Sequence, residues 1–173
     1  MRLTCGEMLV DSGRSMPTEP TGRVVHSIDE LKTLVGQELG ASEWHTISQE
    51  LIDQFADVTG DHQWIHVDIE RAKRESPYGA CIAHGFLTVS LLPGWMKEAV
   101  EVKGDHKMRV NYGFNRLRFT GGVAAGSRVR ARFTLNSVKD VEGGVEIAWG
   151  VSVEVEGRDK PALVAEWLGR TYF

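Results

Sequence analysis

The C-terminal part of the chain alternates apolar and polar residues over three long runs, and this pattern constrains the fold more than any other feature of the sequence. The runs cover residues 128–135, 145–155 and 163–167, and glycine-containing turn segments separate them at 142–144 and 157–161. A period of two places successive side chains on opposite faces of a strand, so each run predicts a strand with one buried face. Because turn residues separate the runs, we expect three antiparallel strands that meander through one sheet.

The segment that precedes these strands is apolar on nearly every side. Residues 85–92 read Gly-Phe-Leu-Thr-Val-Ser-Leu-Leu, which is typical of a helix enclosed by other structure. We expect Pro93 and Gly94 to kink or interrupt this helix, because proline removes a backbone donor and clashes with the preceding turn. From Met108 onward the period changes to two. A sheet wrapped around one long helix is an α+β arrangement, which is the fold class we predict.

The length of the chain fits a single domain. With 173 residues the chain can bury a substantial core, whereas two domains would be small. Residues 1–26 mix Gly, Ser, Thr and Pro with charged residues and show no sustained period. We therefore predict a poorly packed N-terminal extension over residues 1–26 and one domain over residues 27–173.

Capping signals indicate shorter helices before the central one. Ser27 and Glu30 have the spacing of a capping box, and Ser48 precedes a segment with apolar residues on one face. Gly60 follows that second segment at the position where a helix often ends with a positive φ. Asp68 is placed to cap a further short helix. The residues after Gly60 are thus expected to form a loop that hangs from a helix end.

The composition argues against several classes of partner. The 20 basic and 24 acidic residues give no excess of positive charge for a nucleic acid. The two cysteines, Cys5 and Cys81, do not make a disulfide framework. No run approaches the roughly 18 apolar residues of a membrane span, and the first residues lack the features of a signal peptide. We expect a protein of the reducing cytoplasm that does not bind membranes.

Residues 55–66 carry the clearest chemical signal. They read F-A-D-V-T-G-D-H-Q-W-I-H, in which Asp61 and His66 are five positions apart. A carboxylate and an imidazole held this way can bind a single water between them, and such a water can be added to an activated carbon–carbon double bond. Taken alone, a Gly-Asp pair after a helix is more often a turn, and a lone histidine is more often a surface or core residue.

This segment resembles the signature of the MaoC-like, (R)-specific enoyl-CoA hydratases, a group that includes the nodulation protein N-like hydratases. The family pattern has an aromatic residue, then G-D-x-N-P-aliphatic-H, then a small residue, and it corresponds to Phe55, residues 59–66 and Ala72. The similarity continues at residues 83–86, which are like the H-G-[MF] that begins the family's central helix, and at residues 111–119. The resemblance covers the chain from about Leu31 to its C-terminus.

The resemblance implies a hot-dog fold, in which a strongly bent antiparallel sheet wraps around a long central helix. It also implies a homodimer whose sheets join edge to edge, and a lyase of fatty acid metabolism. Two positions depart from the family pattern. Gln63 and Trp64 stand where the family has N-P, and Pro93 stands where some members have a serine.

By the same resemblance, Asp61 and His66 bind the catalytic water, with the imidazole as the usual base. Either residue can then supply the proton that reaches the substrate. Gly85 would begin the central helix, where its N–H and the helix dipole can polarise the thioester oxygen. The alternative for Gly85 is tight packing of the helix against the sheet.

Four further residues are candidates for substrate binding, and two of them, His84 and Gln63, have plainer alternatives. His84 either joins the site or is structural. Gln63 either orients His66 or the acyl chain, or is a polar surface residue. Arg116 and Arg118 alternate onto one face, where either can meet the phosphates of CoA.

The sequence implies no metal and no redox cofactor. His62 and His66 are four positions apart, as metal-binding pairs often are, but the glutamate of an H-E-x-x-H motif is missing. Cys81 lies among small and apolar residues, which suits a buried side chain better than a nucleophile.

We therefore predict an (R)-specific 2-enoyl-CoA hydratase, which is equally a 3-hydroxyacyl-CoA dehydratase, acting on an acyl-CoA or acyl carrier protein thioester. A thioesterase of the same fold is the first alternative, because a fold alone does not decide function. An inactive thioester-binding module is the second, and the departures at Gln63, Trp64 and Pro93 make it conceivable.

Overall fold

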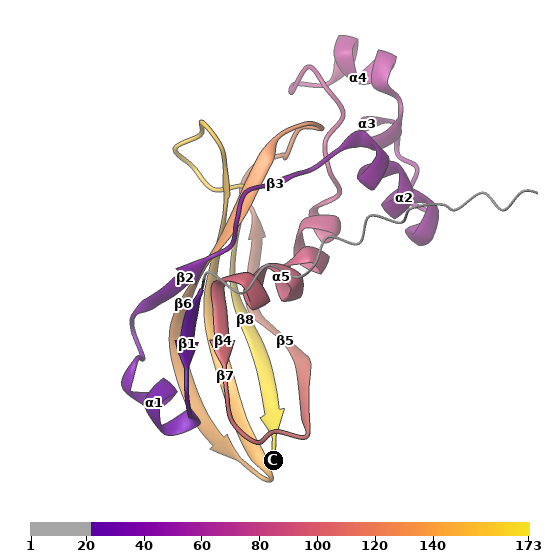
Figure 1. Ribbon diagram of the computed structural model, residues 1–173. Coiled ribbons are helices and arrows are strands. Elements are labelled where there is room, and N and C mark those ends of the chain that lie inside the picture. The colour runs from indigo at the N-terminus through magenta and orange to yellow at the C-terminus, as the bar shows by residue number, and fades with distance from the viewer. Residues whose placement is uncertain (1–21) are drawn as a thin grey trace, which may run out of the picture.

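One antiparallel sheet forms the body of the molecule (Figure 1). The structure, a computed structural model, describes residues 22–173. Strands follow one another across this six-stranded sheet in the order β2-β6-β7-β8-β5, and β3 also pairs with β6. Their bounds are Glu38–Ala41 for β2, His45–Thr46 for β3, Met108–Phe119 for β5, Arg128–Val141 for β6, Gly144–Val155 for β7 and Leu163–Tyr172 for β8. The predicted meander is β6-β7-β8, and β5 adds to its far edge.

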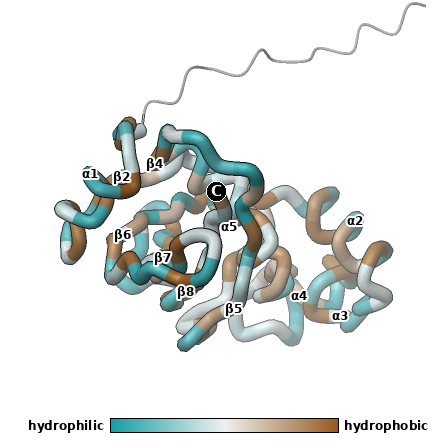
Figure 2. The backbone as a smooth tube through the Cα atoms, turned by 90° about the horizontal axis from the view of Figure 1, so that it is seen from below, coloured by the Kyte–Doolittle hydropathy of each residue, from teal (hydrophilic) through white to brown (hydrophobic). Residues whose placement is uncertain are grey.

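The long helix α5 lies across one face of this sheet, and the shorter helices lie at its two ends (Figures 1 and 2). Helices α2, α3 and α4 are grouped beyond one end of α5, and α1 lies at the opposite end. The helices are α1 Ile28–Thr33, α2 Gln49–Thr59, α3 Trp64–Val67, α4 Ile69–Glu75 and α5 Gly85–Ala99. The α+β arrangement of a sheet around one long helix is therefore confirmed.

The core lies between α5 and the sheet. Phe133 and Leu135 of β6 have no exposed surface, and Leu92 and Trp95 of α5 are 1% and 3% exposed. Hydrophilic and hydrophobic residues alternate along the strands, as Figure 2 shows by colour. The period of two read from the sequence thus gives each strand one face for the core and one for solvent.

The three predicted N-caps are confirmed, but the capping box at Ser27 does not close, because the Glu30 side chain accepts from the N–H of His26. The side chains of Ser27, Ser48 and Asp68 each accept a hydrogen bond from the backbone N–H three residues further on, at 3.0 to 3.1 Å. Gly60 ends α2 with a φ of 74°, in the left-handed region. These local signals place the chain after Gly60 in a loop as far as Gln63, but the expected loop does not extend to His66, because the short helix α3 begins at Trp64.

One short strand lies within the expected N-terminal extension. Arg23–Val25 forms the strand β1, which pairs in parallel with β4 at Val100–Val102. Val25 has no exposed surface and belongs to the core, so this part of the expected extension is packed. Three residues are too few to show a period, and their partner strand is far away in the sequence. The rest of the expected extension, residues 1–21, lies outside the described residues.

Pro93 does not interrupt α5. The helix runs from Gly85 to Ala99 with Pro93 inside it. Leu92 and Trp95 on either side of the proline are buried, and we attribute the continuity of the helix to this packing against the sheet. Within residues 22–173, no helix combines the length and the apolar character that crossing a membrane requires.

Candidate active site

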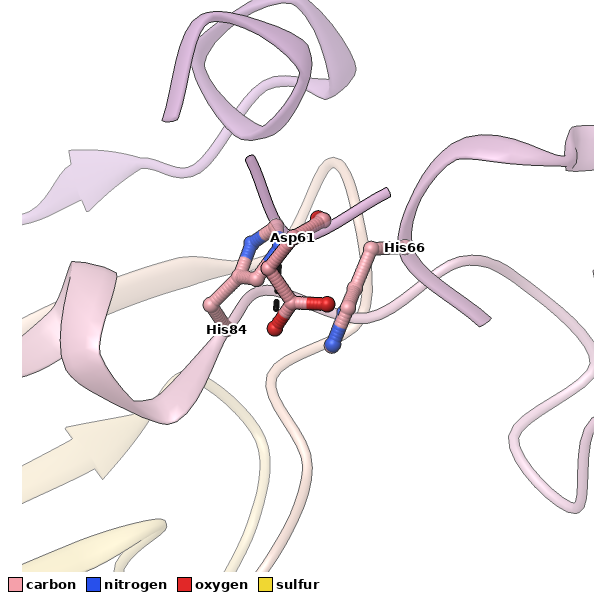
Figure 3. Close-up of side chains that lie close together, drawn as sticks. All are labelled: Asp61, His66 and His84. Atoms are coloured by element: carbon pink, nitrogen blue, oxygen red, sulfur yellow. Dashed lines mark hydrogen bonds and ion pairs between the residues drawn. The ribbon is translucent and has the colours of Figure 1, made fainter. Parts of the chain in front are cut away.

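Three side chains from separate parts of the chain converge beside the N-terminus of α5 (Figure 3). Asp61 follows the end of α2, His66 lies in the short helix α3, and His84 directly precedes α5. One carboxylate oxygen of Asp61 and one ring nitrogen of each histidine all lie within 4.8 Å of one another. The structure therefore brings the predicted pair together and adds His84 to it.

Hydrogen bonds hold both the ring and the backbone carbonyl of His66. Its Nδ1 lies 2.7 Å from the carbonyl oxygen of Ile82, and because a carbonyl only accepts, Nδ1 carries the proton. The Nε2 atom of the neutral ring is then a free acceptor. The Gln49 side chain donates to the backbone carbonyl of His66 at 2.7 Å. His66 is only 8% exposed, so it presents an oriented basic nitrogen from a mostly buried position.

The Asp61 side chain approaches the His66 ring from the solvent side. Its side chain is 57% exposed, and its Oδ1 accepts a long hydrogen bond of 3.4 Å from the N–H of Gln63. A water that makes two hydrogen bonds of about 2.8 Å at a tetrahedral angle spans about 4.6 Å between its partners. An oxygen of Asp61 and a ring nitrogen of His66 lie within 4.8 Å of each other, so a bridging water of this span is compatible with their separation. The pair can therefore hold one water.

A cleft of about 340 Å³ begins at His66. It passes Gly85 and Thr88 of α5, and Phe119 of β5 and Tyr78 form part of its walls. Asp61 is not among the lining residues, but its carboxylate lies within 4.8 Å of a ring nitrogen of His66, which does line the cleft. The cleft is mainly apolar and offers room for a chain beside the histidine.

The sequence leaves two explanations open for Gly85, close packing and an N–H that donates to the substrate, and the surroundings of Gly85 suit both. A Cβ at Gly85 would lie 2.7 Å from the Phe119 ring, so a larger residue would have to displace this ring, and the packing explanation fits. Gly85 is also the first residue of α5, and the N–H groups of Leu87 and Thr88 already bond to the carbonyl of His84. The Gly85 N–H has no partner within the helix, so it can donate to an anion in the cleft.

The other predicted substrate-binding residues lie outside the cleft. Gln63 is exposed, and its hydrogen bonds to Asp61 and His66 come from its backbone. Arg116 and Arg118 are exposed on β5 and do not line the cleft. His84 is buried, at 4% exposed, and does not line it either.

Two residues that the sequence reading did not single out belong to this region. Gln49 holds the backbone of His66, but nothing in the sequence shows that α2 and α3 lie together. Thr88 is 3% exposed and lines the cleft. A polar residue three positions after Gly85 in an apolar run is a signal that could have indicated it.

The histidines are not arranged for a metal ion. The His62 ring bonds to Asp57 at 2.9 Å, and this hydrogen bond is the main cause of a raised pKa for His62. The rings of His66 and His84 are stacked, with centroids 3.8 Å apart and planes at 26°. Nitrogen lone pairs lie in the ring plane, so two nearly parallel rings cannot both direct one at an ion about 2 Å away. We assign no metal to this group.

Comparisons with known proteins agree on one family. The family profile described as a MaoC like domain matches residues 30–156. The 3-hydroxyacyl-thioester dehydratase Z of Mycobacterium tuberculosis is 48% identical over 149 residues, which are 86% of this chain and 97% of that protein. Nodulation protein N of Rhizobium meliloti is 46% identical over 148 residues, which are 85% of this chain and 92% of that protein.

Solved structures show the same fold. A monoamine oxidase regulatory protein from Archaeoglobus superposes with a TM-score of 0.71 at 20% identity, covering 87% of this chain and 97% of its own. An (R)-hydratase from A. caviae involved in PHA biosynthesis gives a TM-score of 0.63 at 20% identity, covering 78% of this chain and 94% of its own. The predicted hot-dog fold is thereby confirmed.

Proposed function

The chain belongs to the family of MaoC-like domains, and on this premise we propose that it is an (R)-specific 2-enoyl thioester hydratase, which in reverse dehydrates a 3-hydroxyacyl thioester. The observation that carries the proposal is the placement of Asp61 and His66 within 4.8 Å of each other beside the cleft. The relative named a 3-hydroxyacyl-thioester dehydratase and the structural neighbour titled an (R)-hydratase support it.

The proposed reaction begins with water held between the Asp61 carboxylate and His66 Nε2. Nε2 takes one proton as the water oxygen bonds to C3 of the enoyl group, while Asp61 accepts a hydrogen bond from the other proton. The C2–C3 π electrons move toward the thioester, and the negative charge collects on its oxygen. A proton from His66, directly or through Asp61, then bonds to C2, so the elements of water are added and no redox partner is needed.

The Gly85 amide is the group proposed to stabilise the charge on the thioester oxygen. It is a free N–H at the positive end of α5, and it lines the cleft in which the thioester would lie. A donor that is already oriented costs little reorganisation when the charge develops. The absence of a side chain at Gly85 lets an acceptor approach this N–H closely.

The proposed substrate is a trans-2-enoyl chain on CoA or on acyl carrier protein. Cleft walls formed by Phe119, Tyr78 and Leu163 suit an apolar thioester chain. We propose the reducing cytoplasm as the compartment, because the two cysteines of the chain, Cys5 and Cys81, are too few for a disulfide framework.

We propose that the protein works as a homodimer joined through β5. β5 lies at the end of the strand order, and within residues 22–173 no strand pairs with the edge of β5 that faces away from β8. Large apolar side chains are exposed near this edge, which is unusual for a monomer. They are Phe86 on α5, and Met108, Tyr112, Phe114 and Phe119 on β5.

The test of the function is incubation of the purified protein with crotonyl-CoA, followed by a panel of longer enoyl-CoA substrates. A hydratase removes the enoyl absorbance without releasing a free thiol, and chiral analysis of the product should give the (R)-3-hydroxyacyl thioester. Release of free CoA would instead establish the thioesterase alternative. Binding of the thioesters without any turnover would establish the binding module.

A further inference from the structure

We propose that His84 is a positioning residue that holds Asp61 against His66 through a hydrogen bond to the Asp61 backbone, without touching the substrate. The inference rests on the proposed function, in which Asp61 and His66 share a water. It assigns a task to the most buried member of the three converging side chains, which the reaction itself does not use (Figure 3).

The burial of His84 excludes it from the cleft. Ala83 and Gly85 on either side of it line the cleft, but His84 does not. Its side chain is 5% exposed, whereas that of Asp61 is 57% exposed. Any effect of the His84 ring on the reaction must therefore pass through neighbouring protein groups.

The hydrogen bond from His84 joins the two halves of the site. Its Nε2 lies 2.9 Å from the carbonyl oxygen of Asp61, and because a carbonyl only accepts, Nε2–H donates. Gly85, the next residue, begins α5 and offers the proposed thioester donor. One bond therefore ties the loop that carries Asp61 to the helix end that carries the Gly85 amide.

The ring of His84 also sets the plane of His66. The two rings are stacked at 3.8 Å between centroids, and the Phe55 ring packs on His84 at 5.1 Å. His66 is held from its other side by the bond from Nδ1 to Ile82. The Nε2 atom of His66 can therefore point only within a narrow range of directions.

The second ring nitrogen of His84 shows what fixes this orientation. Within residues 22–173, Nδ1 of His84 is the buried side-chain nitrogen or oxygen that has no hydrogen-bond partner. Most buried polar atoms in proteins are satisfied, and an exception calls for an explanation. The bond to Asp61 and the stack on His66 are therefore the contacts that orient the His84 ring.

Two substitutions separate the hydrogen bond from the ring. His84→Phe keeps an aromatic ring for stacking but removes the hydrogen-bond donor. His84→Gln keeps an N–H donor at nearly the same distance from the backbone as Nε2. We expect His84→Phe to lower kcat for crotonyl-CoA hydration by about 10²-fold with little change in KM, since small misplacements of catalytic groups have effects of this size. His84→Gln should recover part of kcat, because it restores the hydrogen-bond donor but not the ring that stacks on His66.

A second measurement needs no substrate. The His66 amide bonds to the carbonyl of Gln63 within the site loop, so its hydrogen exchange reports how well this loop is held. Exchange of this amide should accelerate in His84→Phe and return toward the wild-type rate in His84→Gln.

His45 provides the matched control. Its Nε2 lies 2.8 Å from Glu98, and its ring is stacked on Trp95 at 5.7 Å, so it makes the same kinds of contact away from the cleft. His45→Phe should lower the melting temperature while leaving kcat and the exchange of the His66 amide unchanged.

Each result decides the proposal. Unchanged kcat in His84→Phe, a loss that appears mainly in KM, or an equal loss in His84→Gln would overturn it. Unchanged exchange of the His66 amide in His84→Phe would also overturn it, whether or not the wild type hydrates crotonyl-CoA. A wild type without hydratase activity would refute the proposed function alone, and the exchange rates would still decide the role of His84.

Discussion

Gly60 turns the chain from α2 into the loop that carries Asp61. Its φ of 74° lies in the left-handed region, and a Cβ placed there would meet nothing within 4 Å, so the constraint is purely one of backbone conformation. Gly60→Ala should lower the free energy of unfolding by about 1 kcal/mol. Hydratase activity should fall as well, because the strain is relieved by moving Asp61. Thermal unfolding and the rate of crotonyl-CoA hydration measure both effects.

Gly36 supplies the control for this change. It has a φ of 87°, also with nothing within 4 Å, and it lies far from the cleft. Gly36→Ala should cost similar stability and leave the activity of the folded protein intact. Equal activities of the two variants would show that Gly60 matters only for the end of the helix.

Gly85→Ala introduces a contact instead of a strained backbone. The new Cβ would lie 2.7 Å from the Phe119 ring, which is 47% exposed and can move. We expect a modest loss of stability, about 1 kcal/mol, because the ring can give way. The moved ring should narrow the cleft and lower kcat/KM. Adding Phe119→Leu to Gly85→Ala should recover the melting temperature, and a double variant as unstable as Gly85→Ala would contradict this explanation.

At the scale of elements, the Glu166 side chain connects β8 both to its neighbour β5 and to β6, which lies one strand further away. From β8 it accepts hydrogen bonds from Asn115 of β5 at 2.8 Å and from Asn136 of β6 at 3.0 Å. The second of these passes over Gly150 of β7, which has no side chain to block it. These two bonds are the main causes that hold the pKa of the Glu166 carboxyl below its ordinary value of 4.5.

This shift gives a pH-dependent contribution to stability with a definite sign. Because the pKa of Glu166 is lower in the folded than in the unfolded protein, the stabilisation is complete above the unfolded value and is lost as the pH falls through the folded value. Glu166→Gln should therefore reduce the melting temperature at pH 7, and the difference from wild type should shrink as the solution is acidified below 4.5. Replacing Asn115 and Asn136 by alanine should have the same effect. A difference that is constant over this range would rule the contribution out.

The elements show which features of the fold could be predicted from the sequence. The starts of α1, α2 and α4 depend on a side chain and an amide three residues apart, and such short-range signals can be read directly. The strand β1 depends on pairing with the distant β4, and the continuity of α5 through Pro93 depends on burial against the sheet. Both are set by tertiary packing, which local patterns do not contain.

The candidate site likewise combines residues that local sequence patterns indicate with contacts that only tertiary packing creates. Asp61, His66 and Gly85 lie within motifs, and the structure brings them to one place. The contacts that orient them come from His84 and Gln49, which reach across the fold. Their effect depends on how helices pack, so sequence spacing could not indicate it.

At the scale of the whole molecule, the open edge of β5 predicts self-association. Phe114 on this edge is 37% exposed, and a charge in its place should be unfavourable in an interface. Phe114→Glu should shift the protein from dimer to monomer in sedimentation. Val58→Glu is the control, since Val58 is 85% exposed on α2 and a charge there should leave the dimer intact. A wild type that sediments as a monomer would contradict the proposed interface.

The central claim is that Asp61 and His66 act on one shared water, and a double-mutant cycle on crotonyl-CoA hydration tests it most directly. Asp61→Asn and His66→Gln should each lower kcat/KM by about 10²–10⁴-fold. Asp61→Asn should keep the wild-type melting temperature, whereas His66→Gln should remain folded with a lower one, because it loses the ring stack on His84. The double variant should be little worse than the single ones, because residues that act as a unit are not additive. Asp140→Asn, a change of the same kind at an exposed ion pair with Lys32, should leave the rate unchanged. Wild-type rates in Asp61→Asn, or losses that multiply in the double variant, would contradict the shared water.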